Sequence, residues 1–430
     1  MTRGGRAWMV ALTFCGCARA PSTDVAPPPA SAPSATVPPT TTEDASATAE
    51  LPPLPPPSAT ASAGPAPDPP LEGVDFVAQA RTLFRVAACG PSGDVPPRFD
   101  AAVVALHCDE LRRAVDEYRR SWVDVAEPFL ASLRPKSLPP IVVYPFGGGD
   151  LTSALATFPD ATEITTISLE PAGDVRPIDA LRPERLAREL AVHRSHLERL
   201  FEKAHSRTDN LQKEARTDLP GEILFALAAL VVYGDEPISL RYFHLRPDGS
   251  IAYVTQAEID AAKTPAAVRA VFENAELRFR RHAGVGDAGQ VVQVLRHLSY
   301  NLDDAHLKAN PALLSHLSAK GKVSAMTKAA THLLWNEHFR LIRGWLVGHT
   351  DWMVSDSTGL PPRVAGAEGF TQDTYGTFKG PSPFGDPDTA DAEDLARLFA
   401  SEPFRALPFR YGYPDRDGHA HLVVTRRSAH

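Results

Sequence analysis

Residues 141 to 173 read IVVYPFGGGDLTSALATFPDATEITTISLEPAG, and this stretch decides the expected fold. It begins with an apolar, β-branched run and continues through three glycines and an acid, Gly147 to Asp150. A helix-compatible segment follows, and a second β-branched run ends at Glu170. This alternation of strand, turn, helix and strand predicts a buried βαβ unit.

The glycine turn is the first candidate binding site. Glycines adopt backbone angles that other residues avoid, and Asp150 is a candidate N-cap for a helix over residues 151–158, whose first amides would suit an anion or a carbonyl. Glu170 lies about twenty residues further on, the offset at which nucleotide-binding folds place an acid near a ribose. The predicted ligand-binding residues are therefore Gly147, Gly148, Gly149, Asp150 and Glu170.

The order of these features resembles the first strand, glycine loop and second strand of Rossmann-like methyltransferases. The resemblance covers about thirty of the 430 residues, and Thr152 occupies the place of the last glycine in G-x-G-x-x-G. It implies a degenerate, methyltransferase-like nucleotide binder as a minor alternative. A tight strand-to-helix turn is the favoured interpretation, and no cofactor is expected, because adenosyl cofactors are not supplied outside the cytoplasm.

The N-terminus predicts export. Arg3 and Arg6 precede a short apolar run, which forms a secretion signal too short to span a bilayer. The sequence Phe14-Cys15-Gly16-Cys17 resembles the lipobox of bacterial lipoproteins, which implies a signal over residues 1–17 and a lipid on Cys17. Ala18 in place of an aspartate implies an anchor in the outer membrane. An ordinary cleaved signal that releases the protein is the alternative.

Residues 18–70 are rich in Pro, Ala, Ser and Thr, with hardly any aromatic side chain. Such a composition buries too little apolar surface to offset the entropy of ordering, so we expect a disordered tether. The whole chain carries 44 basic and 52 acidic residues, a net charge of -8, without a basic block. Nucleic acid is therefore not an expected partner. The expected partners are the membrane, through the lipid, and a small ligand or another envelope component.

The remaining chain predicts a mixed α/β fold with two lobes, a helical and βαβ lobe over residues 71–234 and an α+β lobe over residues 235–430. Within the second lobe, residues 238–245 and 251–254 predict one antiparallel hairpin, and residues 276–282 and 290–302 predict another. Residues 221–233 are apolar on all sides but number only about a dozen, which favours a buried core helix over a membrane span.

Cysteine and histidine usage predicts a disulfide and no metal. With Cys15 removed and Cys17 acylated, only Cys89 and Cys108 remain, and an oxidising compartment favours a bond between them. Two buried free thiols are the alternative. His193 and His196 share a helix face, but no HExxH motif accompanies them, so a solvated charged face is favoured.

Catalytic signatures are missing from the sequence, which contains no G-x-S-x-G, zinc-type cysteine pair, Walker loop or HExxH. Asp150, Glu170 and Asp356 stand in or beside glycine turns at the ends of predicted strands, which makes them candidate acids for a hydrolase-like alternative. The run Asp356-Ser-Thr-Gly resembles the D-[ST]-G of aspartic proteases, but it is one residue too long and has no second copy, so a capped turn is favoured.

Five short stretches, YPFGGGD, FPDAT, LEPAG, MVSDSTGLPPR and YGTF, resemble an uncharacterised family of secreted bacterial proteins. The likeness implies one recurring architecture and transfers no catalytic residue. The favoured function is therefore a membrane-anchored envelope lipoprotein whose body binds a ligand or a partner without chemistry.

Overall fold

The computed structural model of the chain describes residues 73–91, 93–203, 218–281, 291–381 and 390–428, all of which belong to one compact unit, Thr60–His430. The expected signal, the lipid attachment site Cys17 and the tether lie outside the described residues.

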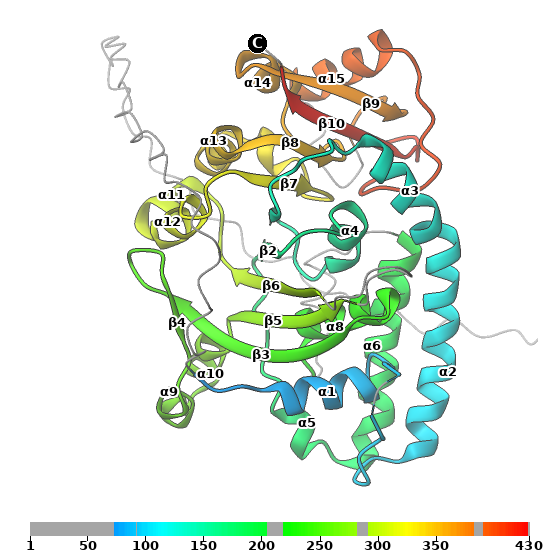
Figure 1. Cartoon of the computed structure of the whole chain (residues 1–430), viewed down its shortest axis with the longest axis vertical. Helices are drawn as coiled ribbons and strands as arrows, with labels where there is room; N and C mark the ends of the chain where they lie inside the picture. Colours follow the sequence, from blue (N-terminus) through cyan, green and yellow to red (C-terminus); the bar gives the residue numbers. More distant parts are fainter. Residues whose placement is uncertain (1–72, 92, 204–217, 282–290, 382–389, 429–430) are drawn as a thin grey trace, which may run out of the picture. The chain divides into compact units, whose positions relative to one another are not determined.

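The body is built on one mixed sheet with the strand order β4-β3-β5-β6-β2-β1-β7-β8-β10-β9 (Figure 1). Neighbouring strands from β6 to β8 pair in parallel, and the strands on either side of this block pair antiparallel. The ten strands are β1 (Ile141–Pro145), β2 (Glu163–Ser168), β3 (Glu236–Leu245), β4 (Ile251–Tyr253), β5 (Asn274–Arg281), β6 (Val291–Ser299), β7 (Val323–Thr327), β8 (Thr350–Ser355), β9 (Phe370–Gly376) and β10 (His421–Arg427).

The mixed α/β class is confirmed, and both expected hairpins, β3 with β4 and β5 with β6, pair antiparallel. The two expected lobes share this sheet. Strand β6, which follows the expected boundary near residue 235, pairs in parallel with β2, which precedes it, with Glu163 opposite Val294. The boundary near residue 235 therefore does not separate two sheets.

Helices pack against both faces of the sheet, because successive buried strand residues point in opposite directions. Val142 and Tyr144 of β1 belong to one hydrophobic core, and Val143 belongs to the other. The first core is completed by α1 (Val77–Val86), α2 (Ala101–Tyr118), α3 (Asp124–Leu133), α4 (Leu151–Thr157), α5 (Pro177–Ala180), α6 (Pro183–Lys203), α8 (Gly221–Tyr233), α9 (Gln256–Ala261) and α10 (Pro265–Val271).

The second core contains residues of α11 (Asp304–Ala309), α12 (Ala312–Ser318), α13 (Arg340–His349) and α14 (Pro362–Ala367). A third, smaller cluster packs α15 (Ala390–Ser401) against β10. A π-helical segment, Arg119–Val123, joins α2 to α3, and two short 3-10 turns, Leu333–Trp335 and Glu337–Phe339, precede α13.

Helix α8 has the expected bounds and is buried along almost its whole length, so the prediction of a core helix is confirmed. It ends at Gly234, whose φ of 73° is the left-handed conformation that glycine accepts most readily. Its one charged residue, Glu222, is buried in the first turn. Throughout the described ranges, no helix combines the length and the apolar character needed to cross a membrane.

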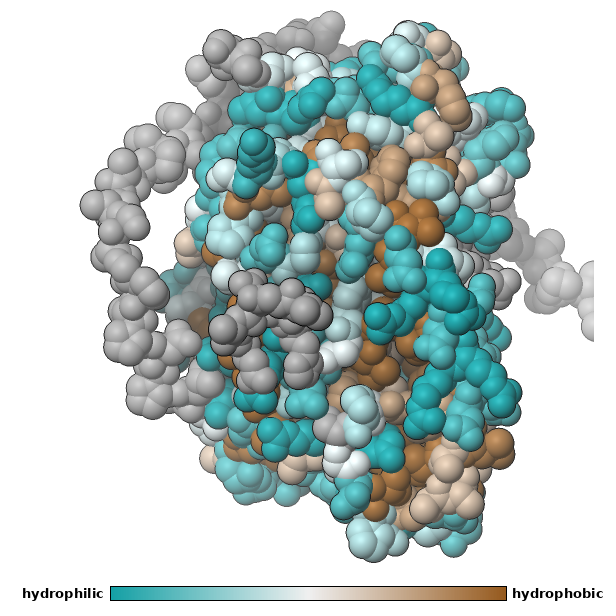
Figure 2. Space-filling model, turned by 45° about the vertical axis from the view of Figure 1, so that its right-hand side comes forward, coloured by the Kyte–Doolittle hydropathy of each residue, from teal (hydrophilic) through white to brown (hydrophobic). Residues whose placement is uncertain are grey.

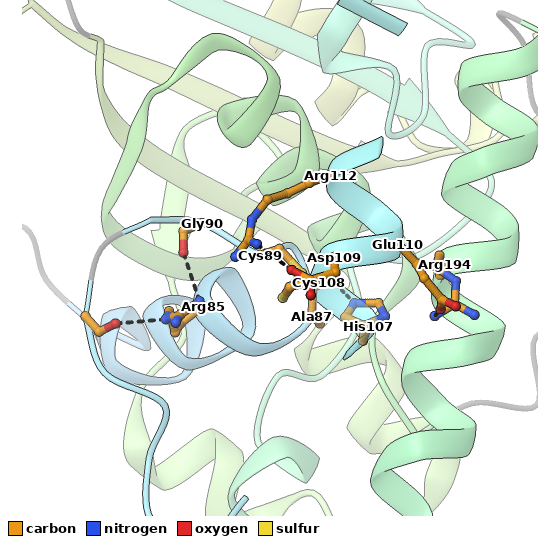
Figure 3. The surroundings of a disulfide bond; sticks show 11 residues. Arg85, Ala87, Cys89, Gly90, His107, Cys108, Asp109, Glu110, Arg112 and Arg194 are labelled. Atoms are coloured by element: carbon orange, nitrogen blue, oxygen red, sulfur yellow. Dashed lines mark hydrogen bonds and ion pairs between the residues drawn. A yellow bond between two sulfur atoms is a disulfide. The ribbon is translucent and has the colours of Figure 1, made fainter. Parts of the chain in front are cut away.

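The expected disulfide between Cys89 and Cys108 is present, and it ties the segment after α1 to α2 (Figure 3). His107 lies next to this bond, and its Nε2 is 2.9 Å from the carbonyl oxygen of Ala87. Burial lowers the pKa of His107 below its ordinary value of 6.5. Linking two buried segments 19 residues apart restricts the unfolded chain, which stabilises the fold.

Buried charges cross three neighbouring strands. Arg296 of β6 contacts Glu276 of β5 with an Nε to Oε2 distance of 2.9 Å, and it also pairs with Glu163 of β2, which Lys320 contacts as well. Burial alone would raise the pKa of Glu163, but the charges of Arg296 and Lys320 outweigh it and lower the pKa to about 2. Glu163 is therefore ionised at every physiological pH.

The surface follows the balanced composition. Figure 2 shows hydrophilic and hydrophobic residues interspersed over one face of the body.

Candidate functional site

The turn after β1 needs its glycines for packing. A Cβ on Gly147 would lie 2.5 Å from the ring of Tyr144, and a Cβ on Gly149 would lie 2.7 Å from Cβ of Phe225. Between them, Gly148 has a φ of +47°, and its own Cβ would meet nothing closer than 3.5 Å. Two of the three glycines therefore permit close approach, and the middle one supplies the conformation of the turn.

Asp150 caps α4 as expected, since its carboxylate accepts a hydrogen bond from the amide of Ser153. The same carboxylate accepts one from Tyr144 and lies 2.6 Å from Nζ of Lys328, whose side chain is only 2 % exposed. Charge and hydrogen bonds are therefore satisfied within the protein. The helix-start amide that would have suited an anion is occupied by Asp150 itself.

Asp356 forms the turn after β8. It accepts hydrogen bonds from the backbone amides of Ala329, Thr358 and Tyr413, at 2.8, 2.9 and 3.0 Å. One buried carboxylate thus holds together three chain segments that are far apart in sequence. This matches the expected capped turn and leaves Asp356 little capacity for a substrate.

A cavity of about 410 Å³ opens beside the glycine turn, where β1, β2, β6 and β7 end. Its lining comprises the three glycines with Phe146, then Ser168, Leu169 and Glu170, then Tyr300, Asn301 and Leu302, then Ala329, Ala330, Thr331, Leu333 and Phe339, together with Glu222 and Tyr413. Four of the five predicted ligand-binding residues therefore share one cavity, and the fifth, Asp150, does not line it. Of the three predicted catalytic acids, only Glu170 lies there.

Two glutamates face this cavity without the partners that buried carboxyls normally have. Oε1 of Glu170 and Oε2 of Glu222 are both buried and neither has a hydrogen-bond partner among the described residues. The carboxyl of Glu222 lies over the glycine turn, since its Oε2 would be 2.9 Å from a Cβ on Gly149. Burial and then the charge of Glu170 raise the pKa of Glu222 well above its ordinary value of 4.5.

The chain is strained around the same cavity. Of the five described non-glycine residues with positive φ, four follow β1 or β7: Phe146, Ala329, Thr331 and His332, with φ between 54° and 61°. Three of them line the cavity. Such conformations cost about 1–3 kcal/mol each and concentrate at functional sites. The sequence does not predict these left-handed conformations, because phenylalanine, alanine and threonine do not favour a positive φ.

A second cavity of about 720 Å³ shares Glu170 and Glu222 with the first, since both residues line both cavities. It is bordered by His193 and His196 of α6. His193 is buried, contrary to the solvated face expected for this pair, and burial followed by the two neighbouring histidines His107 and His196 lowers its pKa to about 3. A neutral histidine of this kind offers hydrogen bonds but no charge.

Among the residues that the structure describes, no group of three or more metal ligands lies at either cavity. The one described group of three or more cysteine, histidine or acidic residues close enough to hold an ion is Cys89, His107 and Cys108, and its two cysteines are joined in the disulfide. Comparison with known protein families, with curated proteins and with solved structures gives no match to this chain.

Proposed function

We propose that this protein is an exported, membrane-anchored lipoprotein whose body binds a small molecule in the cavity beside the glycine turn. The observation that carries the proposal combines strained loops around one cavity with two glutamates, each of which has one buried oxygen without a hydrogen-bond partner among the described residues. Buried carboxyl oxygens without partners and left-handed non-glycine residues both cost stability, and a bound ligand is the simplest reason to retain them together.

The strand order supports the location of the site. The parallel block β6-β2-β1-β7-β8, continued by antiparallel β10 and then β9, resembles the sheet of Rossmann-like methyltransferases. The chain runs outward from β1 in both directions, so β1 and β7 flank the point where the order reverses. Open α/β sheets bind ligands at the carboxyl ends of the strands at such a point, and the cavity lies there.

This resemblance makes an adenosyl nucleotide the alternative ligand. Glu170 follows β2 and has a free oxygen that suits a ribose hydroxyl. The export signal favours instead a ligand that is present outside the cytoplasm.

A second candidate function is acid–base hydrolysis. Burial and the charge of Glu170 raise the pKa of Glu222, and enzymes that use a carboxylic acid as a general acid raise its pKa in this way. The catalytic pair would then be Glu170 and Glu222, in place of Asp150 and Asp356. Turnover of chromogenic esters or glycosides that falls about 100-fold in Glu222→Gln would support this function.

The proposal is tested by a thermal-shift screen of the full-length chain, purified in detergent, against sugars, amines, peptides, nucleotides and metals. A ligand at 100 times its Kd stabilises the folded state by about 2.7 kcal/mol. Ser168→Phe should remove the shift, because Ser168 is half-buried in the cavity wall. Ser132→Phe, on an exposed part of α3, is the matched control. A flat result across all classes would overturn the small-ligand proposal and favour a protein partner.

The anchor has its own test. Cys17→Ser should move the protein from the membrane fraction to the soluble fraction. Retention of the variant in the membrane fraction would contradict the lipobox.

A further inference from the structure

The charged side chains in the cavity wall are all acidic. The wall contains two carboxyl side chains, Glu170 and Glu222, and no lysine, arginine or histidine from any described residue. Anionic groups such as phosphates and carboxylates are normally bound by arginine, lysine or helix-start amides. The wall provides no such side chain, and the amide of Ser153 at the start of α4 is bound by Asp150. An anionic ligand therefore does not fit this cavity.

Aromatic side chains form much of the remaining wall. Phe146, Tyr300, Phe339 and Tyr413 all line the cavity. Phe146 and Phe339 meet edge to face, with ring centroids 5.7 Å apart and an interplanar angle of 78°. The face of an aromatic ring carries partial negative charge and attracts cations. Phe146 holds its place in a left-handed conformation, φ 61°, so the backbone is strained in presenting this ring.

The carboxyl of Glu222 lacks the cationic partner that a buried carboxyl normally has among its neighbours, as far as the described residues show. Glu222 is only 6 % exposed, and its Oε2 has no hydrogen-bond partner among the described residues. Its buried counterpart on β5, Glu276, is 1 % exposed but contacts Arg278, Arg296 and Tyr253, each at 2.9 Å. A buried carboxyl is normally paired with a cation, as Glu276 is. Among the described residues, no cationic side chain pairs with Glu222.

We propose that the cavity binds a small organic ammonium ion, whose charged nitrogen lies between Glu170 and Glu222 and whose carbon skeleton packs on the aromatic rings. This inference rests on the proposed ligand-binding function and names the class of ligand. A metal ion fits less well, because no group of three or more described histidine, cysteine or acidic residues close enough to hold an ion lies at this cavity.

The experiment uses two pairs of probes that differ in charge: choline with its uncharged carbon analogue 3,3-dimethylbutan-1-ol, and glucosamine with glucose. Binding to the full-length chain is measured by isothermal titration calorimetry. We expect at least one cation to bind about tenfold or more tightly than its neutral partner, since the carboxyls and rings act on the charge alone. Glu222→Gln should reduce that preference to about threefold or less, while Glu273→Gln, a half-buried glutamate outside the cavity, should preserve it.

The outcomes separate the two proposals. Equal or tighter binding of the neutral partners would overturn the ammonium class and leave ligand binding intact. Binding of a cation that Glu222→Gln leaves unchanged, with the variant folded by circular dichroism, would overturn the placement at this cavity. Binding of Ca²⁺ or Mg²⁺ in preference to all four probes would replace the ammonium ion by a metal. Failure of every probe, and of the wider ligand screen, would overturn both proposals.

Discussion

If Glu222 is retained for a ligand, its removal should make the empty protein more stable. Its carboxyl is buried in α8, and one of its oxygens has no partner among the described residues. A buried polar group without a partner costs about 1–3 kcal/mol. Methionine has a similar length and no polar hydrogen-bonding requirement. Glu222→Met should therefore raise the free energy of unfolding by about 1–3 kcal/mol at pH 8.

The gain should depend on pH with a definite sign. Because the pKa of Glu222 is raised in the folded state, the folded protein keeps a proton that the unfolded chain releases above its ordinary pKa of 4.5. Stability contributed through this group therefore falls as the pH rises above 4.5. The advantage of Glu222→Met should be smallest near pH 4.5 and grow toward pH 8.

Glu276→Met is the matched control, because Glu276 is also buried but makes three contacts, with Arg278, Arg296 and Tyr253. Removing it takes a carboxylate partner away from the half-buried Arg278 and Arg296, and the expected loss is about 3–5 kcal/mol. Both variants are measured by urea unfolding with circular dichroism at several pH values. A loss of stability in Glu222→Met comparable to that of the control would mean that Glu222 supports the fold, and the case for a ligand there would fall.

Three further predictions concern the fold. Acid should destabilise the protein as the pH falls from about 4.5 through 2. The lowered pKa of Glu163 contributes stability above pH 4.5, and protonation of Glu163 removes it. Glu163→Gln should therefore flatten this part of a pH series of urea melts. Asp150→Asn should cost about 3–5 kcal/mol, since it leaves buried Lys328 without its charge partner; an unchanged urea midpoint would contradict that pairing. Replacing Cys89 and Cys108 together by alanine should cost about 3 kcal/mol, and a thiol assay that finds two free thiols in the unreduced native protein would remove the basis for this estimate.

Local pattern was sufficient for much of the fold. The β-branched runs and the glycines of residues 141–173 predicted β1, α4 and β2, and the apolar run of α8 predicted a buried helix with the observed bounds. These features depend on alternation and turn chemistry, which a short window of sequence contains. The antiparallel hairpins were predictable for the same reason, because their strands are neighbours in the chain.

Long-range order was not predictable in this way. The parallel pairing of β6 with β2 joins strands more than a hundred residues apart, and no local signal distinguishes it from a separate lobe. The cavity depends on that pairing, because Tyr300 follows β6 and reaches the glycine turn only once β6 lies beside β2. Glu222 was missed for a related reason: its neighbours in sequence indicate a core helix, and only the packed structure places its carboxyl over Gly149.

Backbone amides bind Asp150 and Asp356 but, among the described residues, not Glu222, and this difference has a physical cause that applies to other proteins as well. An acid beside a glycine turn lies close to free backbone amides, and those amides bind its carboxylate, as Ser153 does for Asp150 and Thr358 does for Asp356. Such an acid stabilises the turn and has little capacity left for a ligand. An acid in an apolar helix has no such neighbours, so its carboxyl remains unpaired unless something from outside binds it. For Glu222, the apolar sequence around the acid was therefore the better indication of a binding site.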